Sequence, residues 1–94
     1  MRLEKDIEGV LINAVRRRGG KCLKWVCPGQ SGVPDRIVLM PGGKVAFCEL
    51  KRPKGGKVSG LQKWWLDELT RLGFKAYLIK NEDDIKRFIK EMEE

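Results

Sequence analysis

The sequence contains no histidine and only three cysteines among its 94 residues. Without an imidazole, catalytic triads, histidine general bases and nucleases that bind a metal through histidine are excluded. The number of cysteines is odd, and the spacings of Cys22, Cys27 and Cys48 match no disulfide framework or zinc ligand set. We therefore interpret all three as reduced thiols that act as small apolar residues. Any chemistry must therefore depend on carboxylates, lysine and a hard metal ion.

The sequence also lacks a long hydrophobic run. No apolar stretch approaches the roughly 18 to 20 residues of a membrane-spanning helix. The start of the chain, MRLEKDIEGVL, mixes acids and bases where a signal peptide would have an apolar block. We therefore expect a cytoplasmic protein with no membrane partner. The length suffices for one compact domain and not for two, so residues 1–94 are predicted to form a single domain.

Positive charge is in excess: 20 Lys and Arg residues against 13 Asp and Glu give a formal net charge of +7. Such an excess is typical of a protein that binds a polyanion, and nucleic acid is the first candidate. Several basic residues are candidate phosphate contacts, with plain solubility charges as the alternative. They are Arg16, Arg17, Arg18 and Lys21 at the end of a predicted helix, Lys24 in the next strand, and Arg52, Lys54 and Lys57 in a later loop.

Hydrophobic periodicity predicts an α/β fold in the order αβββαβα, a mixed sheet flanked by helices. Helices are expected at about residues 3–18, 58–72 and 82–94, and strands at 22–27, on both sides of residues 42–43, and at 74–80. Gly73 is expected to end the second helix and Asn81 to cap the third. In the second helix, a stripe of Leu61, Trp65, Leu69 and Leu72 is expected to face the core, which leaves Trp64 for a partner surface.

The hairpin sequence GVPDRIVLMPGGKVAFCELK combines apolar residues with charged ones. Glu49 and Lys51 point to the same face because side chains alternate along a strand. Asp35 shares that face only if the two residue numbers of each cross-strand pair in the hairpin add up to an even total, such as 84. A two-residue turn at Gly42–Gly43 would give an odd total and oppose Asp35 to Leu50. A site formed by these charges therefore requires a three- or five-residue loop, or a bulge.

Two carboxylates at close range repel each other, and one must take up a proton unless a cation neutralises them. Mg²⁺ prefers oxygen ligands and retains several waters, so Asp35, Glu49 and a backbone carbonyl form a sufficient protein shell. Lys51 beside the metal can bind the scissile phosphate, orient the attacking water or stabilise developing charge. Taken singly, each residue also fits a turn or a solvent-exposed strand end. Together they favour phosphodiester hydrolysis.

The motifs PD at residues 34–35 and ELK at 49–51 resemble the signature of the PD-(D/E)XK nuclease superfamily. With GVPDRIVL, FCELKRPKG, SGLQKWW and GFKAYLIKNED, nearly the whole chain is similar to the virus-type replication-repair nuclease (VRR-NUC) domain. The resemblance implies a restriction-endonuclease-like fold, Mg²⁺ or Mn²⁺ as the cofactor, branched double-stranded DNA as the partner and no nucleotide cofactor. Stand-alone members occur in phages and bacteria, which implies the cytoplasm of a bacterium or a phage-infected host.

The resemblance also adds residues to the site. The family has a glutamine in the helix after the ELK strand, here Gln62, and a glutamate on the first helix. Glu8 and Glu4 are the alternatives for that glutamate, one turn apart on adjacent parts of one face, and the spacing of Glu8 before Gly19 favours Glu8. The implied metal shell is Glu8, Asp35, Glu49 and the Leu50 carbonyl. The implied catalytic residues are Glu8, Asp35, Glu49, Lys51 and Gln62.

Stand-alone members resemble junction resolvases, which implies a Mg²⁺-dependent endodeoxyribonuclease that resolves Holliday junctions as a homodimer. Two alternatives stay open: a monomeric flap or nicking nuclease, and a catalytically silent DNA-binding accessory domain. The complete set of Asp35, Glu49 and Lys51 argues against the silent domain, because stability alone does not require it.

Overall fold

The order of helices and strands in the computed structural model is the predicted one. The structure describes residues 3–94, so residues 1 and 2 of the predicted domain lie outside the described part. The elements are α1 (Glu4–Arg17), β1 (Lys21–Lys24), β2 (Arg36–Met40), β3 (Lys44–Leu50), α2 (Gly60–Arg71), β4 (Lys75–Ile79) and α3 (Glu82–Glu93). Strand β1 ends three residues earlier than predicted, at Lys24 instead of Cys27. Within residues 3–94, no helix has both the length and the apolar character needed to cross a membrane.

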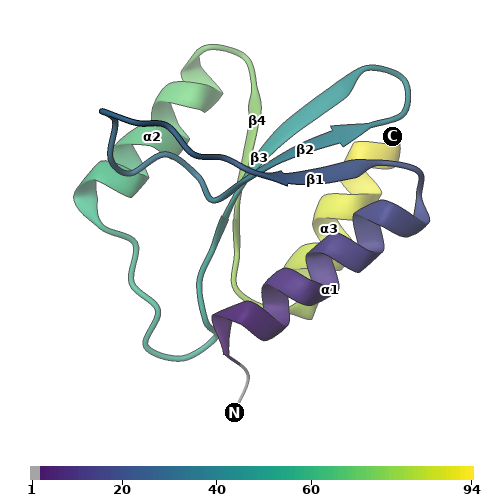
Figure 1. The fold of residues 1–94 in the computed structure, drawn as a ribbon, viewed down its shortest axis with the longest axis horizontal. Coiled ribbons are helices and arrows are strands. Elements are labelled where there is room, and N and C mark those ends of the chain that lie inside the picture. Colours follow the sequence, from purple (N-terminus) through teal and green to yellow (C-terminus); the bar gives the residue numbers. More distant parts are fainter. Residues whose placement is uncertain (1–2) are drawn as a thin grey trace.

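The four strands form one mixed sheet in the order β1-β2-β3-β4. Strand β2 is antiparallel to both of its neighbours, β1 and β3. Strand β4 is parallel to β3. Helices α1 and α3 pack side by side on one face, and α2 lies on the other (Figure 1). This confirms the predicted α/β fold, a mixed sheet flanked by helices.

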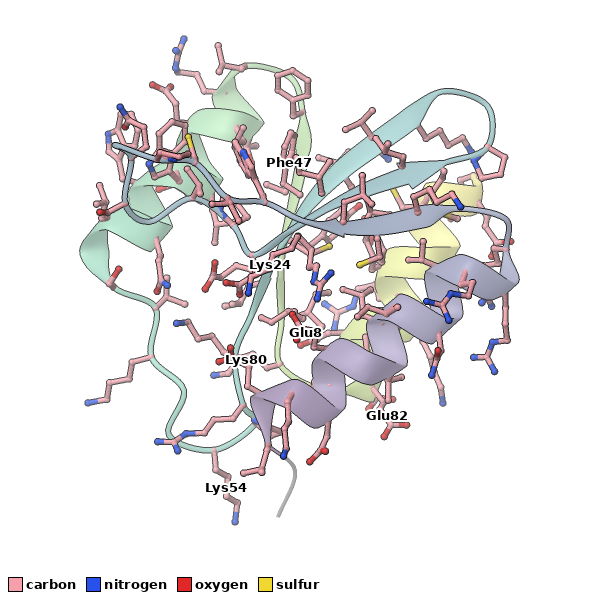
Figure 2. The ribbon with its side chains drawn as sticks, viewed as in Figure 1. Glu8, Lys24, Phe47, Lys54, Lys80 and Glu82 are labelled. Carbon is pink, nitrogen blue, oxygen red and sulfur yellow. The ribbon has the colours of Figure 1, made fainter. Side chains whose placement is uncertain are left out.

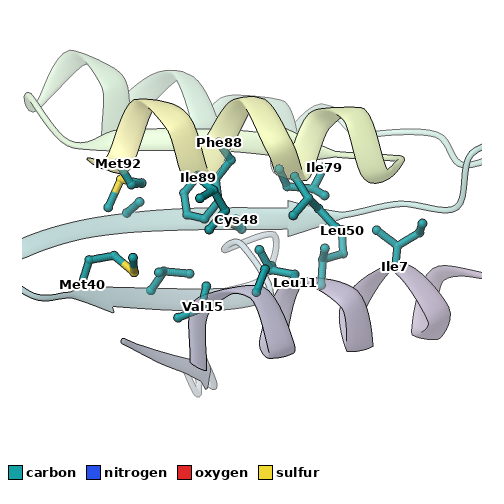
Figure 3. Close-up of a cluster of buried hydrophobic side chains, with 14 residues drawn as sticks. Ile7, Leu11, Val15, Met40, Cys48, Leu50, Ile79, Phe88, Ile89 and Met92 are labelled. Atoms are coloured by element: carbon teal, nitrogen blue, oxygen red, sulfur yellow. The ribbon is translucent and has the colours of Figure 1, made fainter. Parts of the chain in front are cut away.

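The main hydrophobic core lies between the sheet and the α1–α3 pair (Figure 3). Helix α3 has a strongly amphipathic sequence, and its buried residues recur at helical spacing. As predicted, Asn81 caps this helix: its side-chain oxygen accepts a hydrogen bond from the Asp84 backbone N–H at 2.8 Å. The principal buried side chains are Ile7, Leu11, Val15, Val38, Cys48, Leu50, Ile79, Ile85, Phe88 and Met92.

The opposite face of the sheet is covered less completely. Helix α2 packs mainly against the edge strand β4 and buries one side chain, that of Leu69. Leu61 and Leu72 of the predicted stripe are about half exposed, so the expectation of a continuous core-facing stripe was wrong at both ends of the helix. Trp65 is half-buried and makes an edge contact with Trp25. A single helix on an edge strand can bury only the middle of its apolar stripe.

The β2–β3 hairpin has the register that the charged residues require. Ile37 pairs with Phe47 and Met40 with Lys44, so the paired numbers add to 84. The connection is the three-residue loop 41–43, in which both glycines have φ near +80° (88° and 77°). Of the predicted alternatives, a three-residue loop, a five-residue loop or a bulge, the structure has the three-residue loop, and it places Asp35 and Glu49 on a common face.

Candidate active site

Two carboxylates meet where β2 begins and β3 ends. Asp35 immediately precedes β2, and extending the hairpin register places it opposite Glu49. One oxygen of Asp35, Oδ2, accepts a hydrogen bond from the Leu50 backbone N–H at 2.8 Å, and the Asp35 carbonyl accepts one from the Trp25 N–H at 2.9 Å. These bonds connect the acid to β3 on one side and to the segment after β1 on the other. Asp35 is therefore held by backbone groups of both neighbouring segments.

Glu49 is a charged residue inside the protein, with a side chain that is only 1% exposed. Its Oε2 accepts a hydrogen bond from Gln62 Nε2 at 3.0 Å and lies 3.5 Å from Lys51 Nζ. Its Oε1 is also buried and has no hydrogen-bond partner among residues 3–94. An unpaired buried carboxylate oxygen is costly, and a bound cation is the usual way to satisfy one. The donor set here, hard oxygen atoms beside a lysine, fits Mg²⁺.

The protonation of Glu49 reflects this environment. Burial raises its pKa to about 7, the nearby Asp35 carboxylate acts in the same direction, and Lys51 opposes both. Glu4 on α1 makes a smaller contribution that also raises the pKa. Near neutral pH, uptake of a proton or of a cation therefore lowers the cost of keeping this carboxyl group buried.

Gln62 connects the start of α2 to Glu49. The Ser59 hydroxyl accepts a hydrogen bond from the Gln62 backbone N–H at 3.1 Å, and Gln62 Oε1 accepts one from the Ser59 N–H at 2.9 Å. This is a capping box, and it leaves the amide group of Gln62 to donate to Glu49. Ser59 was missed in the sequence analysis, although the capping pattern is visible in SGLQ.

The two candidate glutamates of α1 have different surroundings. Glu8 Oε2 forms an ion pair with Arg36 Nε at 3.0 Å. Glu4 lines an open cleft together with Lys51, and its charge acts on Glu49. Within the described residues, no three His, Cys, Asp or Glu side chains converge closely enough to hold a metal by themselves. The structure thus brings Asp35, Glu49, Lys51 and Gln62 together and turns Glu8 towards Arg36.

A basic cleft of about 660 Å³ lies beside these residues. It is formed by the loop after β3 and the first turn of α1, and its lining residues are Leu3, Glu4, Lys5, Lys51, Arg52, Gly55, Gly56 and Lys57. Arg52 and Lys57 were predicted phosphate contacts, whereas Lys5 was not singled out. Lys54 is on the same loop and extends away from the body of the protein (Figure 2).

The remaining predicted phosphate contacts lie elsewhere. Arg16, Arg17, Arg18 and Lys21 are all exposed. They occur at the far end of α1, which at 14 residues is about 21 Å long. Arg18 is already paired with Glu93 at 3.4 Å. Lys24 is exposed at the end of β1, on the side where Glu8 faces the sheet (Figure 2). The basic residues of the cleft and those at the end of α1 therefore form two groups separated by about the length of that helix.

All three cysteines are free thiols. Cys48 is buried in the core, and burial strongly raises its pKa. Cys22 is half-buried, and burial raises its pKa as well. Thiols in such surroundings are poor nucleophiles, which agrees with their interpretation as small apolar residues.

Comparison with known proteins agrees with the motifs. The sequence profile of the VRR-NUC domain matches residues 6–83. The protein named "Putative nuclease p44" of Acyrthosiphon pisum secondary endosymbiont phage 1 is 41% identical over 80 residues, which are 85% of this chain and 85% of that protein. A solved VRR-NUC domain shares the fold with a TM-score of 0.87, at 22% identity, over 93% of this chain and 94% of the other. These findings confirm the resemblance drawn from the motifs.

Proposed function

The chain belongs to the VRR-NUC family of nuclease domains, and from this premise we propose that it is a Mg²⁺-dependent endodeoxyribonuclease that cuts branched double-stranded DNA. The observation that carries the proposal is the buried Oε1 of Glu49, which lies next to Asp35 and Lys51 and has no hydrogen-bond partner in the described part of the chain. Stability alone gives no reason to bury a carboxylate in this way. A divalent cation offsets the cost, and phosphodiester hydrolysis uses that cation.

In this proposal Asp35, Glu49 and the Leu50 carbonyl hold the metal. Bound Mg²⁺ supplies positive charge against the scissile phosphate and lowers the pKa of the attacking water. Lys51 binds a phosphate oxygen and stabilises the charge that develops on it. Gln62 fixes the Glu49 carboxylate through its amide group, so that the second oxygen keeps its direction. For the acid on α1 we favour Glu4 over Glu8, because Glu4 shares the cleft with Lys51.

The proposed substrate strand runs through the basic cleft. Lys5, Arg52 and Lys57 line it together with Lys51, and we propose that they contact the phosphates next to the scissile one. The formal net charge of +7 supports binding to DNA as a whole. The second basic group, at the end of α1, lies too far away to contact the same phosphates and is positioned for another part of the DNA.

We further propose that the protein acts as a homodimer on Holliday junctions. On the α2 side of the sheet, four large apolar side chains are exposed next to one another along the paired strands and the entry to β4: Leu23, Leu39, Val45 and Phe74. Burying them stabilises a dimer through the hydrophobic effect. A second copy is the proposed occupant because a four-way junction is approximately two-fold symmetric and needs two cuts.

The direct test is cleavage of an end-labelled four-way junction in Mg²⁺ and in EDTA, with linear duplex of the same sequence as the control. We expect paired nicks at the junction in Mg²⁺ only. Equal cutting in EDTA would refute the metal-dependent mechanism. Single, uncoupled nicks would favour a monomeric flap or nicking nuclease. Binding of the junction without any cleavage would favour a catalytically silent accessory domain.

A further inference from the structure

Arg36 joins three segments of the chain next to the candidate site. It directly follows Asp35 in sequence, and its side chain is only 15% exposed. Its Nε donates a hydrogen bond to Glu8 Oε2 at 3.0 Å, and its Nη1 donates one to the Cys22 carbonyl at 3.2 Å. A single guanidinium therefore connects β2, the β1 backbone and α1. The rigid, planar donor group of arginine suits such a connection better than lysine would.

The Glu8–Arg36 pair acts on the part of α1 that approaches the site. Glu8 lies one turn after Glu4, and Glu4 lines the same cleft as Lys51. Ile7, between them in sequence, is buried on an adjoining face of the helix and packs into the core. The buried apolar face of α1 sets the overall orientation of the helix, and the ion pair to Arg36 adds a polar anchor at its second turn.

We propose that Glu8 and Arg36 form a positioning pair that holds Glu4 beside the Asp35–Glu49 site, and that Glu8 does not itself contact the metal. The inference rests on the proposed metal-dependent function and assigns the two α1 acids different roles. The electrostatics agree with this assignment: the Glu4 charge acts on Glu49, whereas the Glu8 charge acts on Cys22. Arg36 thereby becomes a residue of functional importance that the sequence motifs did not indicate.

Charge exchange tests the pair without depending on cleavage. The variants are Glu8→Arg, Arg36→Glu and the double variant Glu8→Arg/Arg36→Glu, and the measurement is the Kd for Mn²⁺ by electron paramagnetic resonance. Each single reversal is expected to weaken Mn²⁺ binding about 10- to 100-fold, the usual range for partners that orient a metal ligand. The double variant restores an opposite-charge pair and is expected to recover most of that loss. If the double variant binds as weakly as Glu8→Arg, the proposal is overturned, because an arginine cannot replace a carboxylate ligand.

Neutral substitutions separate the two acids. In Glu8→Gln the amide oxygen still accepts from Arg36 Nε, so Mn²⁺ affinity is expected to stay within about threefold of wild type. Glu4→Gln is expected to weaken Mn²⁺ binding by about tenfold or more. The reverse order, with Glu8→Gln the more damaging change, would overturn the assignment. The matched control is exchange of the exposed Lys63–Asp67 pair on α2, which should leave the Kd unchanged.

Amide hydrogen exchange gives a readout that needs no metal. If the pair anchors α1, the single reversals should speed exchange in the Ile7–Leu11 segment, and the double variant should restore protection. Unchanged exchange in both single variants would overturn the anchoring role. If wild-type protein fails to bind Mn²⁺ at all, the proposed function fails, and the exchange data alone decide whether the pair anchors α1.

Discussion

Replacing Glu49 by glutamine should stabilise the metal-free protein while destroying its proposed activity. The pKa of Glu49 is about 7 in the folded protein, against an ordinary value of 4.5. Each pKa unit corresponds to about 1.4 kcal/mol, so ionising this buried side chain costs the fold about 3 kcal/mol. Because the carboxyl pKa is raised on folding, the folded state binds more protons than the unfolded state at every pH between these two pKa values. Stability is therefore lost as the pH rises from about 4.5 to 7.

Glu49→Gln has nearly the same shape and carries no charge at any pH. It keeps an acceptor for Gln62, and the loss of the charge opposite Lys51 is already contained in the pKa of about 7. Its amide N–H₂ group takes the place of the buried carboxylate oxygen and needs a hydrogen-bond acceptor there, which takes back part of the gain. We expect a net stabilisation of about 2 kcal/mol at pH 8.5 and almost none at pH 4.5. For a domain of this size that corresponds to a melting temperature about 8 to 16 °C higher at pH 8.5.

The assay is thermal unfolding followed by circular dichroism at both pH values in EDTA, then in excess Mg²⁺. Mg²⁺ should raise the melting temperature of the wild type but not that of Glu49→Gln, because the variant lacks one of the two carboxylates of the site. Asp67→Asn, which neutralises an exposed acid on α2, is the control and should show no comparable dependence on pH. A variant that is no more stable than wild type at pH 8.5, or equally stabilised at both values, would refute the argument.

Three further predictions concern function and assembly. Asp35→Asn should abolish Mg²⁺-dependent cleavage and leave junction binding intact or stronger, since it removes negative charge facing phosphate; retained cleavage would contradict the site. Binding should weaken with salt at a log-log slope of about −4 to −5, as expected for about five neutralised phosphates; a slope near zero would exclude DNA as the partner. Sedimentation at micromolar concentration should give about twice the chain mass of 10.8 kDa, and Leu39→Glu should shift this to the monomer mass; an unchanged mass in the variant would place the interface elsewhere.

The hairpin shows how far sequence can determine a site. Requiring Asp35 and Glu49 on one face fixed the parity of the register and excluded a two-residue turn, because strand periodicity leaves no intermediate solution. The choice among a three-residue loop, a five-residue loop and a bulge was made only by the structure. The choice between Glu4 and Glu8 could not be made in the same way, since both lie on one side of α1. It depends on a partner from a distant segment, Arg36, whose side-chain direction no local pattern reveals.

The second helix shows the opposite limit. Its apolar periodicity correctly indicated the position of Leu69, but periodicity contains no information about how much sheet the helix has to cover. Leu61 and Leu72 were therefore predicted to be buried and are exposed. The same uncertainty applies to any helix that packs on an edge strand.

The double use of the Gln62 side chain restricts which residues position 62 can accept. At this place in a capping box glutamate is as favourable as glutamine, because both offer an oxygen to the backbone N–H of residue 59. A glutamate, however, has no amide proton to donate to Glu49 and would add a negative charge where two already repel. Gln62→Glu would thus preserve the helix and disable the site. Selection for helix stability alone would accept either glutamine or glutamate at position 62. Selection for cleavage would accept only glutamine.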